Sequence, residues 1–325
     1  MSGGEAAVLA EGLSKEYGGG RKRVRALDTL DLTVRRGEVF GYLGPNGAGK
    51  STTIRMLLDL LRPTSGTVRV LGEEPRSGGP GLRRRVGYLA GDFVIEPRQT
   101  VGEALRFLAE LRGGVPPMRI EGLAERLDLD LKRKVRQLSK GNRQKVGVVQ
   151  AFMHRPELLI LDEPTSGLDP LLQQEFLALV REAREDGRTV FMSSHIMSEV
   201  QAVADRVAVI REGRLLTVDT VDSLREHAVR HVAVRLDEGP EEVDAEAFAR
   251  TPGVRDLEVR PAADAAGGSE LRCTLDGRAD GLVKALARYG VAALELEEPD
   301  LEEVFFTLYN HNGGRETGGV TGHGA

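Results

Sequence analysis

The segment from Gly44 to Thr52 has residue types and a spacing suited to holding a nucleoside triphosphate. It matches the pattern G-x-x-x-x-G-K-[ST], in which glycines let backbone N–H groups converge on phosphate oxygens because no Cβ intervenes. We expect Lys50 to bridge the β- and γ-phosphates of ATP and Ser51 to ligate Mg²⁺. The expected nucleotide contacts in this segment are Gly44, Asn46, Gly47, Ala48, Gly49, Lys50, Ser51 and Thr52.

Two carboxylates follow a second apolar run, Leu158–Leu161. Asp162 could hold Mg²⁺ through a coordinated water, and Glu163 could polarise an attacking water as a general base. The alternative is an ordinary acidic turn before Pro164. In a parallel sheet, the carboxyl end of such a strand is where ligands bind, which favours the catalytic interpretation.

His195 follows a third run of the same kind, Val190–Ser194. Taken alone, such a histidine is more often structural. Its place at another strand end favours a contact with the γ-phosphate, where it would hold the attacking water and Glu163 in line. We therefore expect Glu163 and His195 to be the catalytic residues and Ser51 and Asp162 to be the metal ligands.

The sequence also indicates the strands and helices that would position these residues. Val39–Leu43 is a short apolar run that ends at the glycine-rich segment, and an amphipathic helix follows that segment. Short runs of this type are expected of strands buried on both faces. The alternation of strands and helices over the first two-thirds of the chain predicts an α/β fold with a largely parallel sheet.

Two further regions differ from this pattern. Residues 90–155 are rich in helix signals, including a capping box at Thr100–Glu103. After about residue 225 the expected order is β-α-β-β-α-β, a ferredoxin-like α+β arrangement whose first helix covers Glu241–Arg250. An amphipathic segment, Leu301–Tyr309, follows it, and we expect the Gly-rich end, residues 310–325, to be disordered.

Composition limits the possible partners. The chain has 325 residues, 40% of them hydrophobic, and a net charge of −5, so a general nucleic-acid binder is not expected. The single Cys273 excludes an internal disulfide framework. No stretch approaches the roughly 18 apolar residues that span a bilayer, and the first ten residues have no secretion-signal pattern. A membrane partner would therefore have to supply any membrane span.

Residues 6–225 resemble the nucleotide-binding subunit of ATP-binding-cassette (ABC) transporters. Five motifs occur in the family's order: Gly44–Thr52, Leu138–Asn142, Leu159–Pro164, Ser166–Asp169 and His195. The resemblance implies a P-loop NTPase core at 1–225, with an antiparallel β subdomain and a helical subdomain at about 90–155. Residues 226–309, which precede the tail, resemble the C-terminal domain of drug- and antibiotic-export subunits.

The resemblance also implies a head-to-tail homodimer that forms when ATP binds. Each ATP would lie between one subunit's Gly44–Thr52 segment and Ser139, Gly141 and Asn142 of the other, at the N-terminus of a helix. Asp169 would lie at the dimer seam, and Tyr17 would stack on adenine. A transmembrane permease subunit would hold the protein at the cytoplasmic face of the membrane.

Two departures from the family pattern concern turnover. Gly91 stands where the family usually has a glutamine, and it has no side chain to reach Mg²⁺ or water. Asp92 or water could replace that glutamine, or the coupling of hydrolysis could work differently here. Lys140 and Asn142 stand where glycine and glutamine are commoner. Lys140 adds positive charge, and Asn142 keeps the amide on a side chain that is one methylene shorter.

Three functions compete at this point. The leading one is the ATP-hydrolysing subunit of a membrane exporter of drug-like or antibiotic compounds, whose permease would dock near residues 90–115. The alternative is a soluble ABC-type ATPase that acts on ribosomes or DNA, although such relatives usually have two cassettes or a long coiled coil. A small-molecule kinase would not need the segment Leu138–Asn142.

Overall fold

The computed structural model describes residues 6–18, 23–226, 230–262 and 268–297. The chain divides into two compact units, Met1–Asp219 and Thr220–Ala325. The amphipathic segment expected at Leu301–Tyr309 and the disordered tail expected at 310–325 lie outside the described residues.

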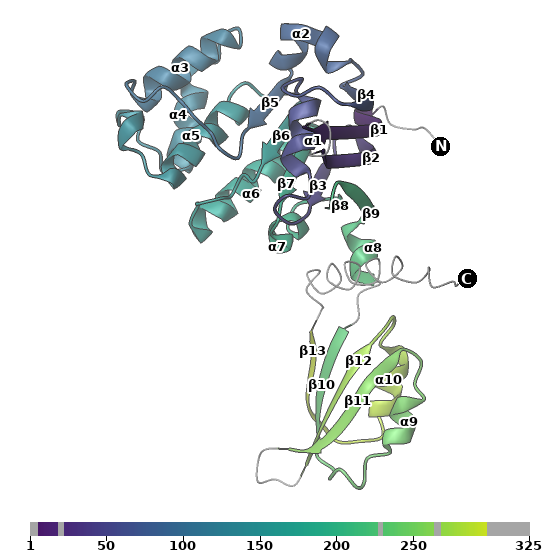
Figure 1. Ribbon diagram of the computed structural model, residues 1–325. Helices are drawn as coiled ribbons and strands as arrows, with labels where there is room; N and C mark the ends of the chain where they lie inside the picture. The colour runs from purple at the N-terminus through teal and green to yellow at the C-terminus, as the bar shows by residue number, and fades with distance from the viewer. Residues whose placement is uncertain (1–5, 19–22, 227–229, 263–267, 298–325) are drawn as a thin grey trace, which may run out of the picture. The chain divides into compact units, whose positions relative to one another are not determined.

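The first unit is built on a six-stranded sheet with the order β5-β6-β7-β3-β8-β9 (Figure 1). Its strands are β3 (Val39–Leu43), β5 (Val86–Leu89), β6 (Leu158–Asp162), β7 (Thr189–Ser194), β8 (Arg206–Arg211) and β9 (Arg214–Thr220). Pairing is parallel from β5 through β6, β7 and β3 to β8. Strands β3, β6 and β7 are buried along their whole length, which explains their continuous apolar runs.

A second, antiparallel sheet with the order β2-β1-β4 belongs to the same unit. It consists of β1 (Ala6–Tyr17), β2 (Val24–Arg35) and β4 (Ser65–Val70). Apolar side chains of both sheets and of helix α1 (Lys50–Leu57) form one buried cluster. Within it the ring of Phe191 packs against Phe40 and Tyr42, with centroid separations of 6.0 and 5.3 Å. This core fixes α1 against the parallel sheet.

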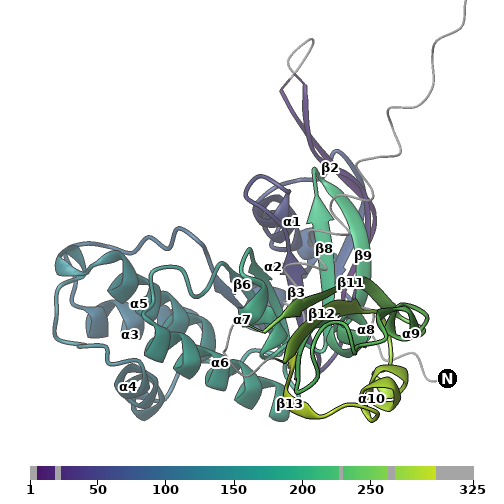
Figure 2. The same cartoon turned by 90° about the horizontal axis from the view of Figure 1, so that it is seen from below.

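The first unit contains further helices besides α1. They are α2 (Pro75–Arg84), α3 (Val101–Leu111), α4 (Pro117–Arg126), the 3₁₀ turn η2 (Val135–Gln137), α5 (Lys140–Phe152), α6 (Pro170–Glu185) and α7 (Met197–Gln201). Helix α5 lies against β5, and α3 and α4 pack on α5, so these three helices form a lobe of their own (Figure 1, Figure 2). The capping box predicted at Thr100 and Glu103 is confirmed and begins α3.

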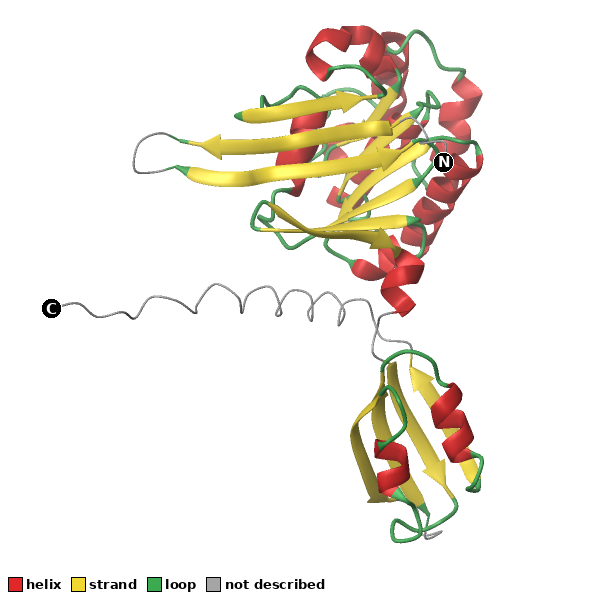
Figure 3. Ribbon diagram, turned by 90° about the vertical axis from the view of Figure 1, so that its right-hand side faces the viewer, coloured by secondary structure: helices red, strands yellow, loops and turns green. Residues whose placement is uncertain are grey.

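The second unit contains a four-stranded antiparallel sheet with the order β11-β12-β10-β13. After α8 (Val221–Glu226), its elements are β10 (Arg230–Leu236), α9 (Ala245–Ala249), β11 (Val254–Pro261), β12 (Ser269–Leu275), α10 (Asp280–Leu286) and β13 (Val291–Glu297). Figure 3 shows α9 and α10 on the same face of this sheet, where Phe248 and Leu282 join its buried side chains.

The first helix of this unit was predicted over Glu241–Arg250, and that range is wrong at its start. The helix begins after Asp244, whose side chain accepts a hydrogen bond from the backbone N–H of Ala247 at 3.0 Å. An aspartate cap satisfies one of the donors that a helix start leaves free, so it sets the boundary at this residue. The preceding Val243 is buried in the core instead of continuing a helix.

Candidate functional site

The glycine-rich segment connects β3 to α1, as its sequence predicted. Gly49 precedes the helix with φ of 111°, and a Cβ there would lie 2.7 Å from the carbonyl oxygen of Ala26. Only glycine satisfies both conditions, so the backbone can turn directly into α1. The loop is further held by the N–H of Gly213, which donates to the Ala48 carbonyl at 3.0 Å. The N-terminus of α1 therefore faces the edge where phosphate is expected.

Lys50 is the first residue of α1 and is buried. Its Nζ donates to the carbonyl of Gly44 at 2.6 Å and to that of Pro45 at 3.3 Å. The same Nζ lies 3.2 Å from Oε1 of Glu163 at the end of β6. Lys50 thus connects the loop to the carboxylate of Glu163, which was predicted from the sequence to be the general base.

Asp162 is the last residue of β6, and its side chain is buried. Its Oδ1 accepts a hydrogen bond of 2.7 Å from the hydroxyl of Ser193 on the neighbouring strand β7. Strands β6 and β7 pair Asp162 directly with Ser193, so the parallel register brings the two side chains together. This hydrogen bond orients the carboxyl group and places an oxygen-donor side chain at the sheet edge.

Glu163 lies between a lysine and a histidine. Its Oε2 is 2.6 Å from Nδ1 of His195, and its Oε1 faces Lys50. The backbone of Glu163 has φ of 48°, which is uncommon for a residue other than glycine. Its N–H donates to the carbonyl of Ser193 at 3.2 Å and to the Ser193 hydroxyl at 3.3 Å. Residues from β3–α1, β6 and β7 therefore converge at one point, as the parallel topology predicts.

The segment expected to contact a partner's nucleotide begins α5. Ser139 caps this helix, because its hydroxyl accepts from the backbone N–H of Asn142 at 3.2 Å. The side-chain amide of Asn142 lies 3.2 Å from the same oxygen. Gly141 packs on Gly167 so closely that a Cβ would lie 2.4 Å from the Gly167 carbonyl oxygen. The first turn of α5 is thereby fixed to the segment that follows Glu163.

Asp169 and Tyr17 lie apart from this convergence. Asp169 caps α6, where its Oδ1 accepts from the N–H of Leu172 at 3.1 Å. Tyr17 is at the end of β1, with 39% of its surface exposed, and the ammonium of Lys15 lies 5.4 Å from its ring centroid. An exposed ring at a strand end is compatible with adenine stacking, and this role of Tyr17 stays a prediction, as do the assigned roles of the other site residues.

Gly91 lies beside the metal-ligand candidate Asp162. A Cβ on Gly91 would be 3.5 Å from the Asp162 carbonyl oxygen and 3.7 Å from its Oδ2, which are ordinary contacts. The family's usual glutamine position is therefore next to Asp162, and here it has no side chain. The neighbouring Asp92 is exposed. That Asp92 replaces the glutamine stays a prediction.

Sequence reasoning missed two residues of the site, Ser193 and Gln144. Ser193 orients Asp162 and accepts from the backbone of Glu163. Gln144 of α5 is buried and donates to the carbonyls of Glu163 and Pro164 at 3.2 and 2.9 Å. Two signals for these residues were available in the sequence, because buried polar groups need hydrogen-bond partners. Ser193 is a hydroxyl near the end of an apolar strand, and Gln144 is an amide on a helix face expected to be buried.

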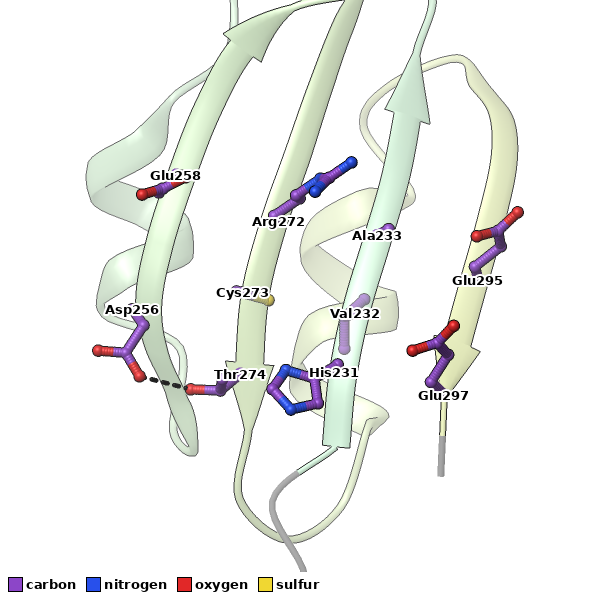
Figure 4. A pocket seen from close by; sticks show the side chains of 10 residues that line it. All are labelled: His231, Val232, Ala233, Asp256, Glu258, Arg272, Cys273, Thr274, Glu295 and Glu297. Carbon is purple, nitrogen blue, oxygen red and sulfur yellow. Dashed lines mark hydrogen bonds between the residues drawn. The ribbon is translucent and has the colours of Figure 1, made fainter. Parts of the chain in front are cut away.

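The second unit offers a hollow of about 320 Å³ on the sheet face opposite its helices. Carboxylates of β11 and β13, including Asp256 and Glu297, flank Arg272 and His231 of the inner strands (Figure 4). In Figure 4, Thr274 is joined to Asp256 by a hydrogen bond of 3.0 Å. Within the described ranges, no group of three or more His, Cys, Asp or Glu side chains could hold a metal. The hollow is lined by charged side chains of both signs.

Comparisons with known proteins agree with this arrangement. Residues 27–166 match the family described as ABC transporter. The chain is 37% identical over 227 residues to the bacitracin transport ATP-binding protein BcrA of Bacillus licheniformis, which covers 69% of this chain and 73% of BcrA. The chain belongs to the ABC transporter family and is an ATP-binding, ATP-hydrolysing subunit of that family.

Within the family, a second relative matches along most of the chain. The daunorubicin/doxorubicin resistance ATP-binding protein DrrA of Streptomyces peucetius is 34% identical over 316 residues, covering 94% of this chain and 93% of DrrA. A solved structure described as the ATP-binding subunit of an ABC transporter has a TM-score of 0.61 and 31% identity, covering 67% of this chain and 92% of its own. Among the described residues, no helix has the length and apolar character that a membrane span requires.

Proposed function

We propose that this chain is the ATP-hydrolysing subunit of a membrane exporter for drug-like or antibiotic compounds. The site observation that carries the proposal is the position of Glu163 between Lys50 and His195 at the carboxyl edge of the parallel sheet. The export assignment is supported by DrrA and BcrA, which are named for drug resistance and for bacitracin transport. None of the three similar proteins described above is named as acting on ribosomes or DNA.

In this proposal Lys50 provides the positive charge for the β- and γ-phosphates, while the N-terminus of α1 and its loop supply backbone donors. Glu163 accepts a proton from the attacking water. His195 keeps the carboxylate oriented through the 2.6 Å contact between Nδ1 and Oε2 and contacts the γ-phosphate. Binding of a γ-phosphate draws Lys50 away from Glu163, which frees the carboxylate for the water.

The oxygen-donor set fits Mg²⁺. Ser51 lies in the first turn of α1, and Asp162 is an oriented carboxylate at the end of β6. Mg²⁺ prefers oxygen ligands and commonly combines one or two protein groups with waters and substrate phosphates. Ser51 and Asp162 would hold the ion, and when bound it would neutralise charge on the phosphates.

We further propose that two copies enclose ATP head to tail. The N-terminal turn of α5 carries Ser139, Gly141 and Asn142, and these would bind the partner's γ-phosphate. Asp169 would lie at the seam, and Tyr17 would stack on adenine. Hydrolysis removes the γ-phosphate that both halves bind, so it would let the two copies separate.

The permease would dock on the apolar surface of the helical lobe. Val94, Phe107 and Leu111 are exposed to 87%, 53% and 60%. Phe107 and Leu111 are one turn apart on the same face of α3. Arg112, which follows Leu111, lines a mostly apolar pocket of about 150 Å³ together with Leu60. Contiguous exposed apolar side chains mark protein interaction sites. A permease bound here would hold the chain at the cytoplasmic face of the membrane, so ATP-driven closure could move it.

For the C-terminal region we propose a ferredoxin-like accessory domain within residues 226–309. Support comes from the order β10-α9-β11-β12-α10-β13 together with the sheet order β11-β12-β10-β13. DrrA matches across this region as well as across the ATPase unit. The domain would therefore be part of the exporter subunit.

The proposal is tested with Glu163→Gln in the full-length chain. The variant should bind ATP as the wild type does, hydrolyse it at least about a hundredfold more slowly and remain dimeric with ATP. Size-exclusion chromatography with and without ATP, combined with a phosphate-release assay, reports both properties. A monomer in ATP would contradict the head-to-tail dimer, and normal turnover would contradict the role of Glu163.

Affinity purification from solubilised membranes tests the transport assignment. An integral membrane protein recovered with the wild type, and lost when Phe107 and Leu111 are changed to serine, would support docking on the helical lobe. Recovery of ribosomes or nucleic acid instead would favour the alternative function. The double variant should keep its ATP affinity, since neither side chain belongs to the nucleotide site.

A further inference from the structure

Gln144 makes an unusual connection between helix α5 and the backbone of Glu163. Its side chain is buried, and Nε2 donates to two consecutive carbonyls, those of Glu163 at 3.2 Å and Pro164 at 2.9 Å. A side-chain amide has two N–H donors, so both bonds can form at once. An apolar side chain of similar length would fill the space and leave both carbonyls without this donor.

The bonded peptide belongs to a residue whose conformation needs support. Glu163 has φ of 48°, a region that residues other than glycine rarely occupy. On its N–H side it is held by the carbonyl and the hydroxyl of Ser193, at 3.2 and 3.3 Å. On its carbonyl side it is held by Gln144. The direction in which the carboxylate leaves the backbone thus depends on bonds from β7 and from α5 together.

Helix α5 also touches the chain after Glu163 at a second point. Gly141 packs on the carbonyl of Gly167, and Nζ of Lys140 lies 3.2 Å from the hydroxyl of Ser166. The first two turns of α5 and residues 163–167 consequently contact each other at both ends. A shift of the start of α5 would be transmitted to the peptide of Glu163 through Gln144.

We propose that Gln144 is a positioning residue for ATP hydrolysis. It fixes the backbone from which the Glu163 carboxylate reaches the attacking water. It also links that carboxylate to the turn formed by Ser139, Gly141 and Asn142. Since that turn faces the partner's nucleotide in the proposed dimer, Gln144 lets each subunit sense the phosphate bound by the other. This inference rests on the proposed roles of Glu163 and of the α5 N-terminus.

The test compares Gln144→Met with Gln150→Met in the full-length chain. Gln150 is a matched control, because it is a glutamine of the same helix, is similarly buried and donates to the carbonyl of Tyr88. Methionine keeps the length and volume and removes the donor. Gln144→Met should lower kcat about 10- to 100-fold, because small misplacements of a catalytic group have effects of that order.

The KM for ATP should change by less than about twofold in Gln144→Met, since no contact with bound nucleotide is removed. Gln150→Met should keep kcat within about twofold of the wild type while losing as much thermal stability as Gln144→Met. Gln144→Leu, which differs in shape and also lacks the donor, should reproduce the loss of kcat. Together these results would support a role in orientation beyond packing.

Three results would overturn the inference. These are equal losses of kcat in Gln144→Met and Gln150→Met, a kcat above half the wild-type value in Gln144→Met, and a rise in KM at constant kcat. Glu163→Gln, measured in parallel, separates this inference from the proposed function. If Glu163→Gln is inactive and Gln144→Met is normal, only the role of Gln144 fails. If Glu163→Gln hydrolyses ATP normally, the role of Glu163 fails as well.

Discussion

The six-stranded sheet of the first unit and the four-stranded sheet of the second unit differ in where they place polar side chains. In the six-stranded sheet, β3, β6 and β7 are buried throughout. Apart from Thr189 at the start of β7 and the hydroxyl of Tyr42, their polar side chains come at or just beyond the carboxyl ends. In the four-stranded antiparallel sheet, charged residues such as Arg272 and Glu295 alternate along the strands and cover the open face. The six-stranded sheet thus concentrates polar side chains of different kinds at one edge, whereas the four-stranded sheet spreads charged side chains over one face.

Strand direction explains this difference. Parallel strands end at the same edge, so the chain positions after them meet whatever their separation in sequence. Lys50 and Glu163 are far apart along the chain and only 3.2 Å apart at their charged atoms. In the antiparallel sheet, neighbouring strand ends alternate, and the pairs on the open face, such as Arg272 with Glu270, are surface ion pairs. Charge alone therefore does not indicate a catalytic site.

The largest effect is expected when the same substitution is made in both units. Lys50→Met removes the buried ammonium that joins Gly44 and Glu163, and it should reduce ATP hydrolysis about 10²- to 10³-fold, as loss of one preorganised charge typically does. Lys284→Met removes an exposed ammonium that pairs with Asp280 on α10 and should leave hydrolysis unchanged. Phosphate release at saturating ATP measures both.

The wild type and Lys284→Met should unfold at similar temperatures, which is the control for folding. A Lys50→Met variant that retains more than a tenth of the wild-type rate would contradict the contrast between the two sheets. A large loss in Lys284→Met would also contradict it, because it would give the second unit a direct part in hydrolysis.

A smaller effect is expected from adding one methyl group to a helix start. A Cβ at Gly141 would lie 2.4 Å from a backbone oxygen of Gly167, so the chain must shift. We expect Gly141→Ala to destabilise the first unit by about 1–3 kcal/mol, the usual range for overpacking. Hydrolysis should fall about tenfold, because the shift moves the α5 turn and the segment after Glu163 together.

Gly281→Ala is the matched change in the second unit. A Cβ there would lie 3.0 Å from Cγ2 of Thr251, a longer distance than the 2.4 Å contact at Gly141. Alanine in a helix also restricts the unfolded chain, so the stability of the second unit should change by less than about 1 kcal/mol. Urea unfolding and phosphate release measure both variants. Equal destabilisation by the two substitutions would show that the contact of α5 with Gly167 is not specially tight.

Much of the first unit could be predicted from the sequence, because each element carried its own signal. Continuous apolar runs predicted β3, β6 and β7, and the capping box that begins at Thr100 was predicted from local residue types. The convergence of the Gly44–Thr52 segment, Glu163 and His195 followed from parallel topology. These predictions depend on short-range rules and on one rule about strand direction.

What the sequence could not predict depends on distances between elements. Gln144 is one polar residue in a largely buried helix, and nothing local indicates that its amide reaches Glu163. The 3.2 Å contact of Lys50 with Glu163 likewise depends on how α1 and β6 pack. In the second unit, the start of α9 was misplaced, because Glu241 and Glu242 suit a helix while the capping bond of Asp244 determines where it begins.

The smallest effect concerns stability and is confined to the first unit. Burial, together with the nearby Arg112 cation, lowers the pKa of His154 from 6.5 to about 4. Below about pH 6.5 the unfolded chain binds a proton at this residue, whereas the folded chain stays neutral until about pH 4. Stability should therefore decrease as the pH falls through this window, and above it His154 should contribute no pH dependence.

His154→Gln should make the first unit's unfolding free energy less sensitive to pH between about 7.5 and 5, since no imidazole remains to take up a proton on unfolding. Urea titrations at both pH values, followed by probes specific to each unit, measure the change. The second unit is the internal control, because His154 belongs to the first unit. Wild type and variant should therefore lose equal stability in the second unit when the pH is lowered. The same loss in both proteins in the first unit would contradict a neutral, half-buried His154. If the variant changes the pH dependence of unfolding only in the first unit, His154, which lies outside the ATP site, makes the stability of that unit sensitive to acid.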